Sequence, residues 1–205
     1  MNKKPIIIVA GEPNSVFLEI FFKSLKRNYY KSPLILIVNK KLLIKQMHHL
    51  GFNFKLNQIA LNSVNFEKLN NKKINIINVD YNFKNAFEKI SKKSNKYIKK
   101  SFKIALEILK KNKFSKFING PVSKRYFLEG KSLGITEYLA KQSKIKDEVA
   151  MLIFNDKLSV SPVTTHLALK DVHKHISKEK IKSHIILISQ FYKKRFKKNP
   201  RIAIT

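Results

Sequence analysis

Short apolar runs rich in β-branched residues recur along the chain, and each has the length and composition of a β-strand. The runs lie at residues 5–10, 34–38, 74–79, 114–119, 148–154 and 157–163. Asn155-Asp156, between the last two runs, is typical of a hairpin turn and predicts that they pair with each other. Arg201 to Thr205 predicts one more strand at the end of the sequence.

Between these runs, apolar residues recur at helical spacing. Helices are therefore expected at residues 16–25, 40–50, 83–113 and 169–175, and from residue 177 onwards. Ser15 and Ser177 can cap the first and the last of them, because a serine hydroxyl accepts hydrogen bonds from first-turn N–H groups. Gly51 closes the second helix, and Ser94-Asn95 predicts the true start of the third.

The alternation of strands and helices predicts an α/β fold with a mostly parallel sheet. At 205 residues the chain suffices for one sizeable domain, and no internal repeat or low-complexity linker divides it. We therefore expect residues 1–205 to form a single α/β region, with an edge strand and a loop within residues 52–73. A strand predicted at the very C-terminus favours a piece of a longer protein, because a buried strand normally continues to the surface.

The formal net charge of +30 raises the question of nucleic-acid binding. Only four of the 43 basic residues are arginines, whereas base readout depends on the arginine fork. The lysines are spread over the whole chain, which indicates a bias of composition. We therefore expect no specific nucleic-acid partner, although non-specific adhesion to polyanions in low salt follows from the charge.

Location and covalent chemistry are limited by what the sequence lacks. The chain contains no cysteine, which excludes disulfides and thiolate metal sites. It has no window of 18 apolar residues and no signal-peptide pattern, so we expect a cytoplasmic protein without a membrane partner.

Two stretches carry the polar chemistry of a possible site, because ligands of α/β proteins bind where strands end. One is Phe117 to Ala140 and the other is Ser159 to Leu169. The turn Gly120 to Lys124 could bind an anion through its N–H groups, hydroxyl and ammonium, or could simply be a strand-to-helix turn. Thr136 could cap a helix or hold a ligand oxygen. Glu12, after the first strand, is interpreted as a structural turn residue.

His166 is the most promising single side chain, because it follows a predicted strand end. A neutral imidazole there could bind a divalent metal or act as a base, and the alternative is a histidine that closes a loop. One histidine does not make a metal site by itself. The chain has no G-x-G-x-x-G and no P-loop, so neither a Rossmann dinucleotide site nor a P-loop is supported.

Three segments together resemble the 4-hydroxythreonine-4-phosphate dehydrogenase family. They are Ile118 to Lys124 (INGPVSK), Gly134 to Ala140 (GITEYLA) and Val163 to Leu169 (VTTHLAL), and Gly11-Glu12-Pro13 matches an N-terminal landmark of the family. The resemblance covers the whole chain and is specific through the order and spacing of the segments.

The resemblance implies an NAD-dependent, divalent-metal-assisted oxidation of 4-phosphooxy-L-threonine, with decarboxylation, for pyridoxal phosphate biosynthesis. The metal would be zinc, magnesium or cobalt. It also implies the layered α/β/α fold of isocitrate and isopropylmalate dehydrogenases, as a homodimer. The family continues past the strand at residue 201, with two further metal histidines and the main NAD-binding segment, so the chain would be an N-terminal portion whose C-terminal part is missing.

Residue by residue, the resemblance implies a metal ligand in His166 and substrate contacts at Thr136 and Ile135. The family usually has a histidine where this chain has Ile135, so that contact would be apolar. Two alternatives remain open. One is a related dehydrogenase of another phosphorylated hydroxy acid, since a missing polar partner can shift substrate choice. The other is a non-catalytic polyanion-binding domain.

Overall fold

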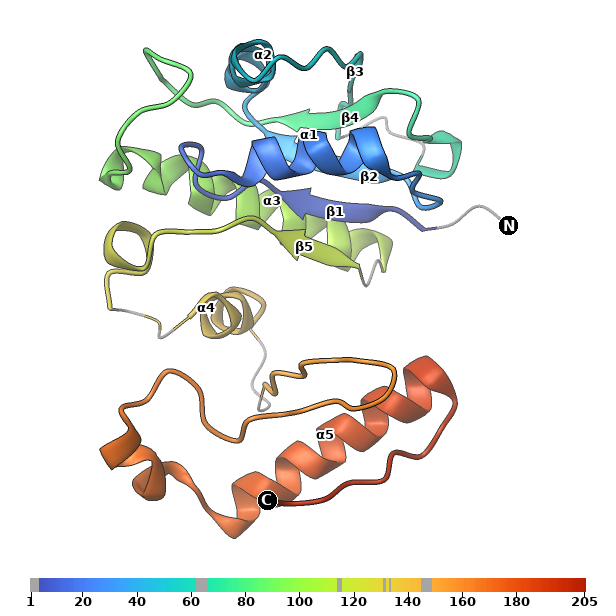
Figure 1. Ribbon diagram of the computed structural model, residues 1–205, viewed down its shortest axis with the longest axis vertical. Coiled ribbons are helices and arrows are strands. Elements are labelled where there is room, and N and C mark those ends of the chain that lie inside the picture. Colours follow the sequence, from blue (N-terminus) through green and yellow to red (C-terminus); the bar gives the residue numbers. More distant parts are fainter. Residues whose placement is uncertain (1–3, 62–65, 114–115, 131, 133, 145–148) are drawn as a thin grey trace. The chain divides into compact units, whose positions relative to one another are not determined.

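The computed structural model describes residues 1–205 except 1–3, 62–65, 114–115, 131, 133 and 145–148 (Figure 1). The chain forms two compact units, residues 1–129 and residues 130–205.

The first unit is built on a parallel five-stranded sheet with strand order β3-β4-β2-β1-β5. Its strands are β1 (Ile6–Val9), β2 (Leu34–Val38), β3 (Leu56–Gln58), β4 (Ile74–Asn78) and β5 (Phe117–Asn119). Four of them lie where the apolar runs predicted strands. The fifth, β3, is the edge strand expected within residues 52–73. The predicted α/β class with a parallel sheet is therefore confirmed.

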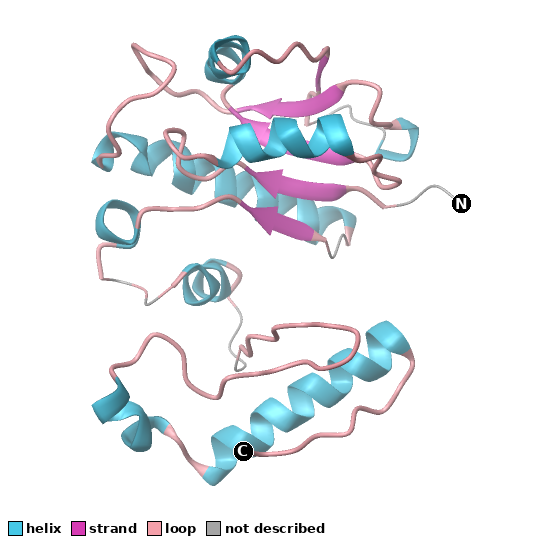
Figure 2. Cartoon of the chain, viewed as in Figure 1, coloured by secondary structure: helices cyan, strands magenta, loops and turns pink. Residues whose placement is uncertain are grey.

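Helices cover both faces of this sheet, as Figures 1 and 2 show. They are α1 (Phe17–Arg27), α2 (Lys40–His49) and α3 (Asn95–Asn112), with short helical segments at Phe66–Lys68, Lys92–Ser94 and Lys124–Leu128. Asn39 begins α2 by accepting the Leu42 N–H at 2.9 Å. Gly51, with φ of 72°, follows that helix as predicted. α3 begins at Asn95, also as predicted.

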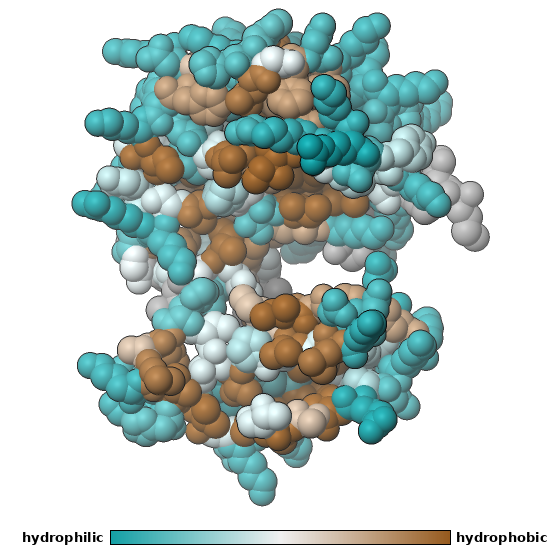
Figure 3. All heavy atoms as spheres, in the orientation of Figure 1, coloured by the Kyte–Doolittle hydropathy of each residue, from teal (hydrophilic) through white to brown (hydrophobic). Residues whose placement is uncertain are grey.

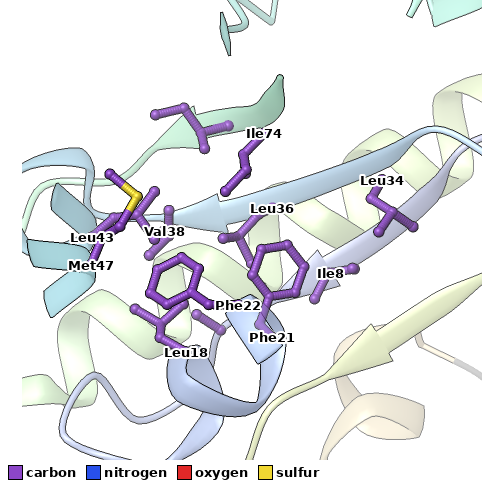
Figure 4. Packing of buried hydrophobic residues seen from close by; sticks show 12 residues of the cluster. Ile8, Leu18, Phe21, Phe22, Leu34, Leu36, Val38, Leu43, Met47 and Ile74 are labelled. Carbon is purple, nitrogen blue, oxygen red and sulfur yellow. The ribbon is translucent and has the colours of Figure 1, made fainter. Parts of the chain in front are cut away.

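The core of the first unit follows from the alternation of side chains along each strand. Ile8 and Leu36 belong to a cluster with Phe21 and Phe22 of α1, which Figure 4 shows from close by. Their neighbours on the strands face the opposite side, where α3 packs on β1 and β2. Phe22 is fully buried, and burial of such a side chain stabilises the fold by about 1.5–3 kcal/mol.

The second unit contains α4 (Ile135–Gln142), the 3-10 helix Leu169–His175 and α5 (Lys178–Phe196). Ser177 caps α5 as predicted, accepting the Lys180 N–H at 3.2 Å. Among the described residues of this unit, no apolar side chain is buried. Apolar surface is visible over this part of the chain in Figure 3, and Leu158 and Leu169 are 72% and 89% exposed.

The prediction of strands in the second unit was wrong. Residues 148–154 and 157–163 form only one isolated antiparallel bridge, between Ile153 and Val160, and Glu148 lies outside the described residues. Arg201 to Thr205 forms no strand and is exposed. The turn between the two arms does form, since Asn155 Oδ1 accepts the Lys157 N–H at 2.9 Å. A lone hairpin without a third strand or a packed face is only marginally stable, which explains the short ladder.

Candidate functional site

The carboxyl ends of β1 and β5 are joined by a direct backbone contact. The Glu12 N–H donates to the Pro121 carbonyl at 2.8 Å, and the Gly120 N–H donates to the Val9 carbonyl at 2.7 Å. A Cβ atom on Gly120 would lie 2.1 Å from the Ala10 carbonyl oxygen, so only glycine fits there. The glycine of the Gly-Pro turn therefore has a packing function.

The turn after β5 uses its own hydroxyl locally. Ser123 Oγ accepts the Tyr126 N–H at 3.2 Å and thereby caps the short helix Lys124–Leu128. Of the two interpretations of residues 120–124, this geometry supports the strand-to-helix turn.

Glu12 is buried to a degree that the sequence did not predict, with only 3% of its surface exposed. Its Oε2 accepts the Ser94 hydroxyl at 2.7 Å and its Oε1 accepts the Asn14 N–H at 3.3 Å. The pKa of the nearby Tyr81 is raised, mainly because the phenol is partly buried and to a smaller extent because the Glu12 and Glu88 carboxylates are negatively charged. The bonds of Glu12 join the turn after β1 to the start of α3, which supports its structural role.

The second unit brings together the segments around Thr136 and His166. α4 begins at Ile135, directly after the buried Gly134, so Thr136 lies inside the first turn. The cap interpretation of Thr136 was therefore wrong, and the ligand interpretation remains. Ile135 is half-buried.

His166 follows an irregular segment rather than the predicted strand end. Its φ of 59° is left-handed, a conformation that histidine adopts more readily than most residues. Its exposed ring reaches Gly134, where an added Cβ would lie 2.8 Å from His166 Nε2 and 2.8 Å from Glu137 Oε2. Glu137 Oε1 accepts the Thr165 hydroxyl at 3.2 Å. The sequence pattern gave no sign of Glu137's position beside His166.

A cavity of about 280 Å³ lies beside this segment, within the second unit. Its polar lining comes from Thr136, Glu137, Thr164, Thr165, His175, Lys180 and His184. Lys180 Nζ donates to the His175 carbonyl at 3.3 Å. His184 is 6% exposed, and sequence reasoning left it undecided between core and surface. Thr136 is the predicted substrate residue that lines this cavity.

Among the described residues, no three histidine or acidic side chains are close enough together to hold a metal ion. His166 and Glu137 offer two ligand atoms that suit a divalent cation, an imidazole nitrogen and a carboxylate oxygen. Among the described residues, the buried Glu137 Oε2 has no hydrogen-bond partner, which leaves a place for a proton donor or a cation near His166. No helix in the described ranges is long and apolar enough to cross a membrane.

Comparisons with known proteins agree with this architecture. The family model of the pyridoxal phosphate biosynthetic protein PdxA matches residues 30–205. A 4-hydroxythreonine-4-phosphate dehydrogenase from Sulfurihydrogenibium sp. is 33% identical, over 97% of this chain and 61% of that protein. A "Putative D-threonate 4-phosphate dehydrogenase" from Oceanobacillus iheyensis is 28% identical, over 100% of this chain and 63% of that protein. The chain thus spans less than two thirds of the length of these relatives.

A solved structure shows the same fold. The 4-hydroxythreonine-4-phosphate dehydrogenase from Burkholderia phymatum matches with a TM-score of 0.76 at 23% identity, over 92% of this chain and 58% of that chain. At this identity the likeness concerns the fold alone. Together with the family model, which matches most of the sequence, it completes the assignment: the chain belongs to the family of the pyridoxal phosphate biosynthetic protein PdxA.

Proposed function

We propose that the protein oxidises 4-phosphooxy-L-threonine, with NAD as the hydride acceptor and with a divalent metal ion, as a step of pyridoxal phosphate biosynthesis. The observation that carries this proposal is the meeting of the Thr136 and His166 segments around Gly134 within one unit. Membership in the PdxA family and the name of the Sulfurihydrogenibium relative support it.

The chain's own residues have distinct roles in this reaction. A ring nitrogen of His166 would bind the cation, which would polarise the substrate hydroxyl and the carbonyl that replaces it. Thr136 offers a hydroxyl that both donates and accepts hydrogen bonds, and it binds a substrate oxygen. Ile135 makes an apolar contact beside it. The oxidised carbon loses a hydride to NAD, its hydroxyl loses a proton, and the resulting β-keto acid releases CO2.

The direct test is NADH formation by the purified protein extended past Thr205, because the family resemblance implies that the main NAD-binding segment lies there. The protein would be incubated with NAD, 4-phosphooxy-L-threonine and zinc, magnesium or cobalt in turn, and absorbance at the NADH band would be followed. We expect turnover in wild type and its loss in His166→Ala, with Glu107→Ala as a control, because Glu107 is an exposed residue of α3 in the first unit. Absence of NADH formation with every metal would contradict the proposed activity.

A second candidate activity is oxidation of a related phosphorylated hydroxy acid. Ile135 favours it, because loss of a polar partner changes which substrate groups the site can satisfy. The name of the Oceanobacillus relative points to a substrate without an amino group, D-threonate 4-phosphate. Comparison of kcat/KM for the two phosphorylated substrates would separate the candidates.

The third alternative, a non-catalytic polyanion-binding domain, rests on the net charge of +30 alone. Counterion release makes such binding fall steeply with salt. A salt titration of DNA binding tests it, and only sequence-selective binding at moderate salt would support it.

A homodimer is the proposed assembly. The second unit leaves its described apolar side chains unburied, and a second copy of the chain would cover part of that surface. Molar mass from light scattering or sedimentation equilibrium would test this, and a monomer at high micromolar concentration would contradict it.

A further inference from the structure

The two carboxylate oxygens of Glu137 differ in their hydrogen bonding. Its Oε1 accepts the Thr165 hydroxyl at 3.2 Å. Its Oε2 is buried and has no hydrogen-bond partner among the described residues. A buried acceptor without a partner costs about 1–3 kcal/mol, and more when it is charged. Such an atom therefore marks a place where a proton donor or a cation belongs.

The ring of His166 faces the same place. The point where a Cβ of Gly134 would stand lies 2.8 Å from Glu137 Oε2 and 2.8 Å from His166 Nε2. The two atoms are thus separated by at most twice that distance. In the described part of the chain, no side chain or backbone group forms a hydrogen bond with this ring nitrogen. The two side chains form no direct hydrogen bond or ion pair as they stand, and rotation about their side-chain bonds would bring donor and acceptor together.

Gly134 makes this approach possible through its missing side chain rather than through its backbone. Its φ of −153° is extended and open to any residue. An alanine there would instead place its methyl group against both Glu137 Oε2 and His166 Nε2. The glycine therefore leaves room for the two side chains to meet.

We propose that Glu137 is a positioning residue for His166: Glu137 Oε2 accepts the Nε2–H of the imidazole, so that Nδ1 is free to bind the divalent cation. This inference rests on the proposed metal-binding role of His166. Histidines that bind metals commonly donate their other ring N–H to a carboxylate, which sets the tautomer and the ring orientation. The Thr165 hydroxyl in turn donates a hydrogen bond to the Glu137 carboxylate. Thr165, Glu137 and His166 would thus form a series of hydrogen-bonded side chains that ends at the cation.

The experiment measures metal binding at single histidines, independently of turnover. Mn²⁺ is titrated into the protein, and paramagnetic broadening of the Cε1–H signals of the six histidines is followed by NMR. The His166 signal is assigned with His166→Ala. We expect it to broaden at lower Mn²⁺ than the other five. Loss of a carboxylate that supports a metal ligand typically weakens metal binding by about 10–100-fold. In Glu137→Ala we therefore expect the His166 signal to need about 10–100 times more Mn²⁺ for the same broadening, and the other five histidine signals to respond as in wild type.

Conservative variants separate positioning from folding. Glu137→Gln keeps the size of the side chain and removes its charge, and we expect weakened broadening at His166 with an otherwise unchanged spectrum. Glu137→Asp keeps the charge, and we expect it to restore part of the affinity. Thr165→Val removes only the bond to Oε1, and we expect an intermediate effect. Glu107→Ala, in the first unit, serves as the exposed acidic control.

The outcomes distinguish this inference from the proposed function. Broadening at His166 that is equal in wild type and in Glu137→Gln would overturn the positioning role and leave the metal role of His166 intact. Absence of His166 broadening in wild type would overturn both of these roles. NADH formation in the activity assay, followed separately, decides the dehydrogenase proposal itself.

Discussion

Ser94 donates a 2.7 Å hydrogen bond to the buried carboxylate of Glu12, a residue 82 positions earlier in the sequence. Ser94 precedes α3, and Glu12 lies in the turn after β1. Both side chains are nearly inaccessible, with 1% and 3% of their surfaces exposed. A buried carboxylate is stable only when hydrogen bonds replace its water, so this contact links the helix to the sheet.

Ser94→Ala should therefore destabilise the first unit. The substitution removes a hydrogen bond to a charged, buried acceptor, and we expect a loss of about 1.5–3 kcal/mol in the free energy of unfolding. Urea denaturation followed by circular dichroism would measure it. Ser143→Ala is the control, because Ser143 is exposed at the end of α4, and a change within about 0.5 kcal/mol is expected there. Equal effects of the two variants would refute the importance of the Glu12 contact.

Gly11 and Gly51 provide a matched pair for the effect of crowding. Both have left-handed backbones, with φ of 77° and 72°. A Cβ on Gly11 would stand 2.4 Å from the Pro121 carbonyl oxygen, whereas nothing lies within 4 Å of one on Gly51. Gly51→Ala should cost only the conformational penalty of about 1–2 kcal/mol. Gly11→Ala should cost about 1–3 kcal/mol more, because the backbone at Pro121 must move to make room for the methyl group. Similar unfolding midpoints for both variants would show that the loops after β1 and β5 are not tightly held.

Glu88 should make stability depend on acid pH. The Lys84 N–H, then the Lys93 ammonium and the Asn85 N–H, lower the pKa of Glu88 to about 2 from an ordinary 4.5. Because the folded pKa is the lower one, this stabilisation is present above pH 4.5 and is lost as pH falls towards 2.

Glu88→Gln should therefore lower the melting temperature at neutral pH and flatten its fall between pH 4.5 and 2. Melting temperatures at a series of pH values, at low and at high salt, would measure both effects. The difference should shrink in high salt, because the side chain is near the surface. Parallel pH profiles of wild type and variant would contradict the assigned pKa.

The first unit was largely predictable because the apolar positions that define its strands and helices in the sequence are the ones that are buried in its core. Leu34 to Val38 is buried along its whole length, as a continuous apolar run in a parallel sheet requires. The glycine that follows α2, Gly51, and the start of α3 at Asn95 also follow local chemistry. The burial of Glu12 was not predictable, since its partner Ser94 is distant in sequence and nothing in the hydrophobic pattern marks a polar contact of this kind.

The second unit shows the limit of the same reasoning. The runs around Ile153 and Val160 have strand composition, yet they form only one bridge, because composition does not supply neighbouring strands. Position along the sequence and a family resemblance predicted site roles for Thr136 and His166. Glu137 lies next to Thr136 but was overlooked, because its contact with Thr165 and its closeness to His166 depend on the folded path of residues 162–166.

Ile135→His should shift the protein towards substrates that offer a polar group at this position. Ile135 is the first residue of α4 and adjoins Thr136, so an imidazole there can form one additional hydrogen bond to the substrate. A hydrogen bond worth about 1.4 kcal/mol changes kcat/KM by about tenfold. We expect the variant-to-wild-type ratio of kcat/KM for 4-phosphooxy-L-threonine to rise by that amount, measured as NADH formation. Ile176→His, at an exposed position before α5, is the control and should leave the ratio unchanged. An unchanged ratio in Ile135→His would remove Ile135 from the substrate contacts and would leave Thr136 as the sole proposed substrate contact of α4.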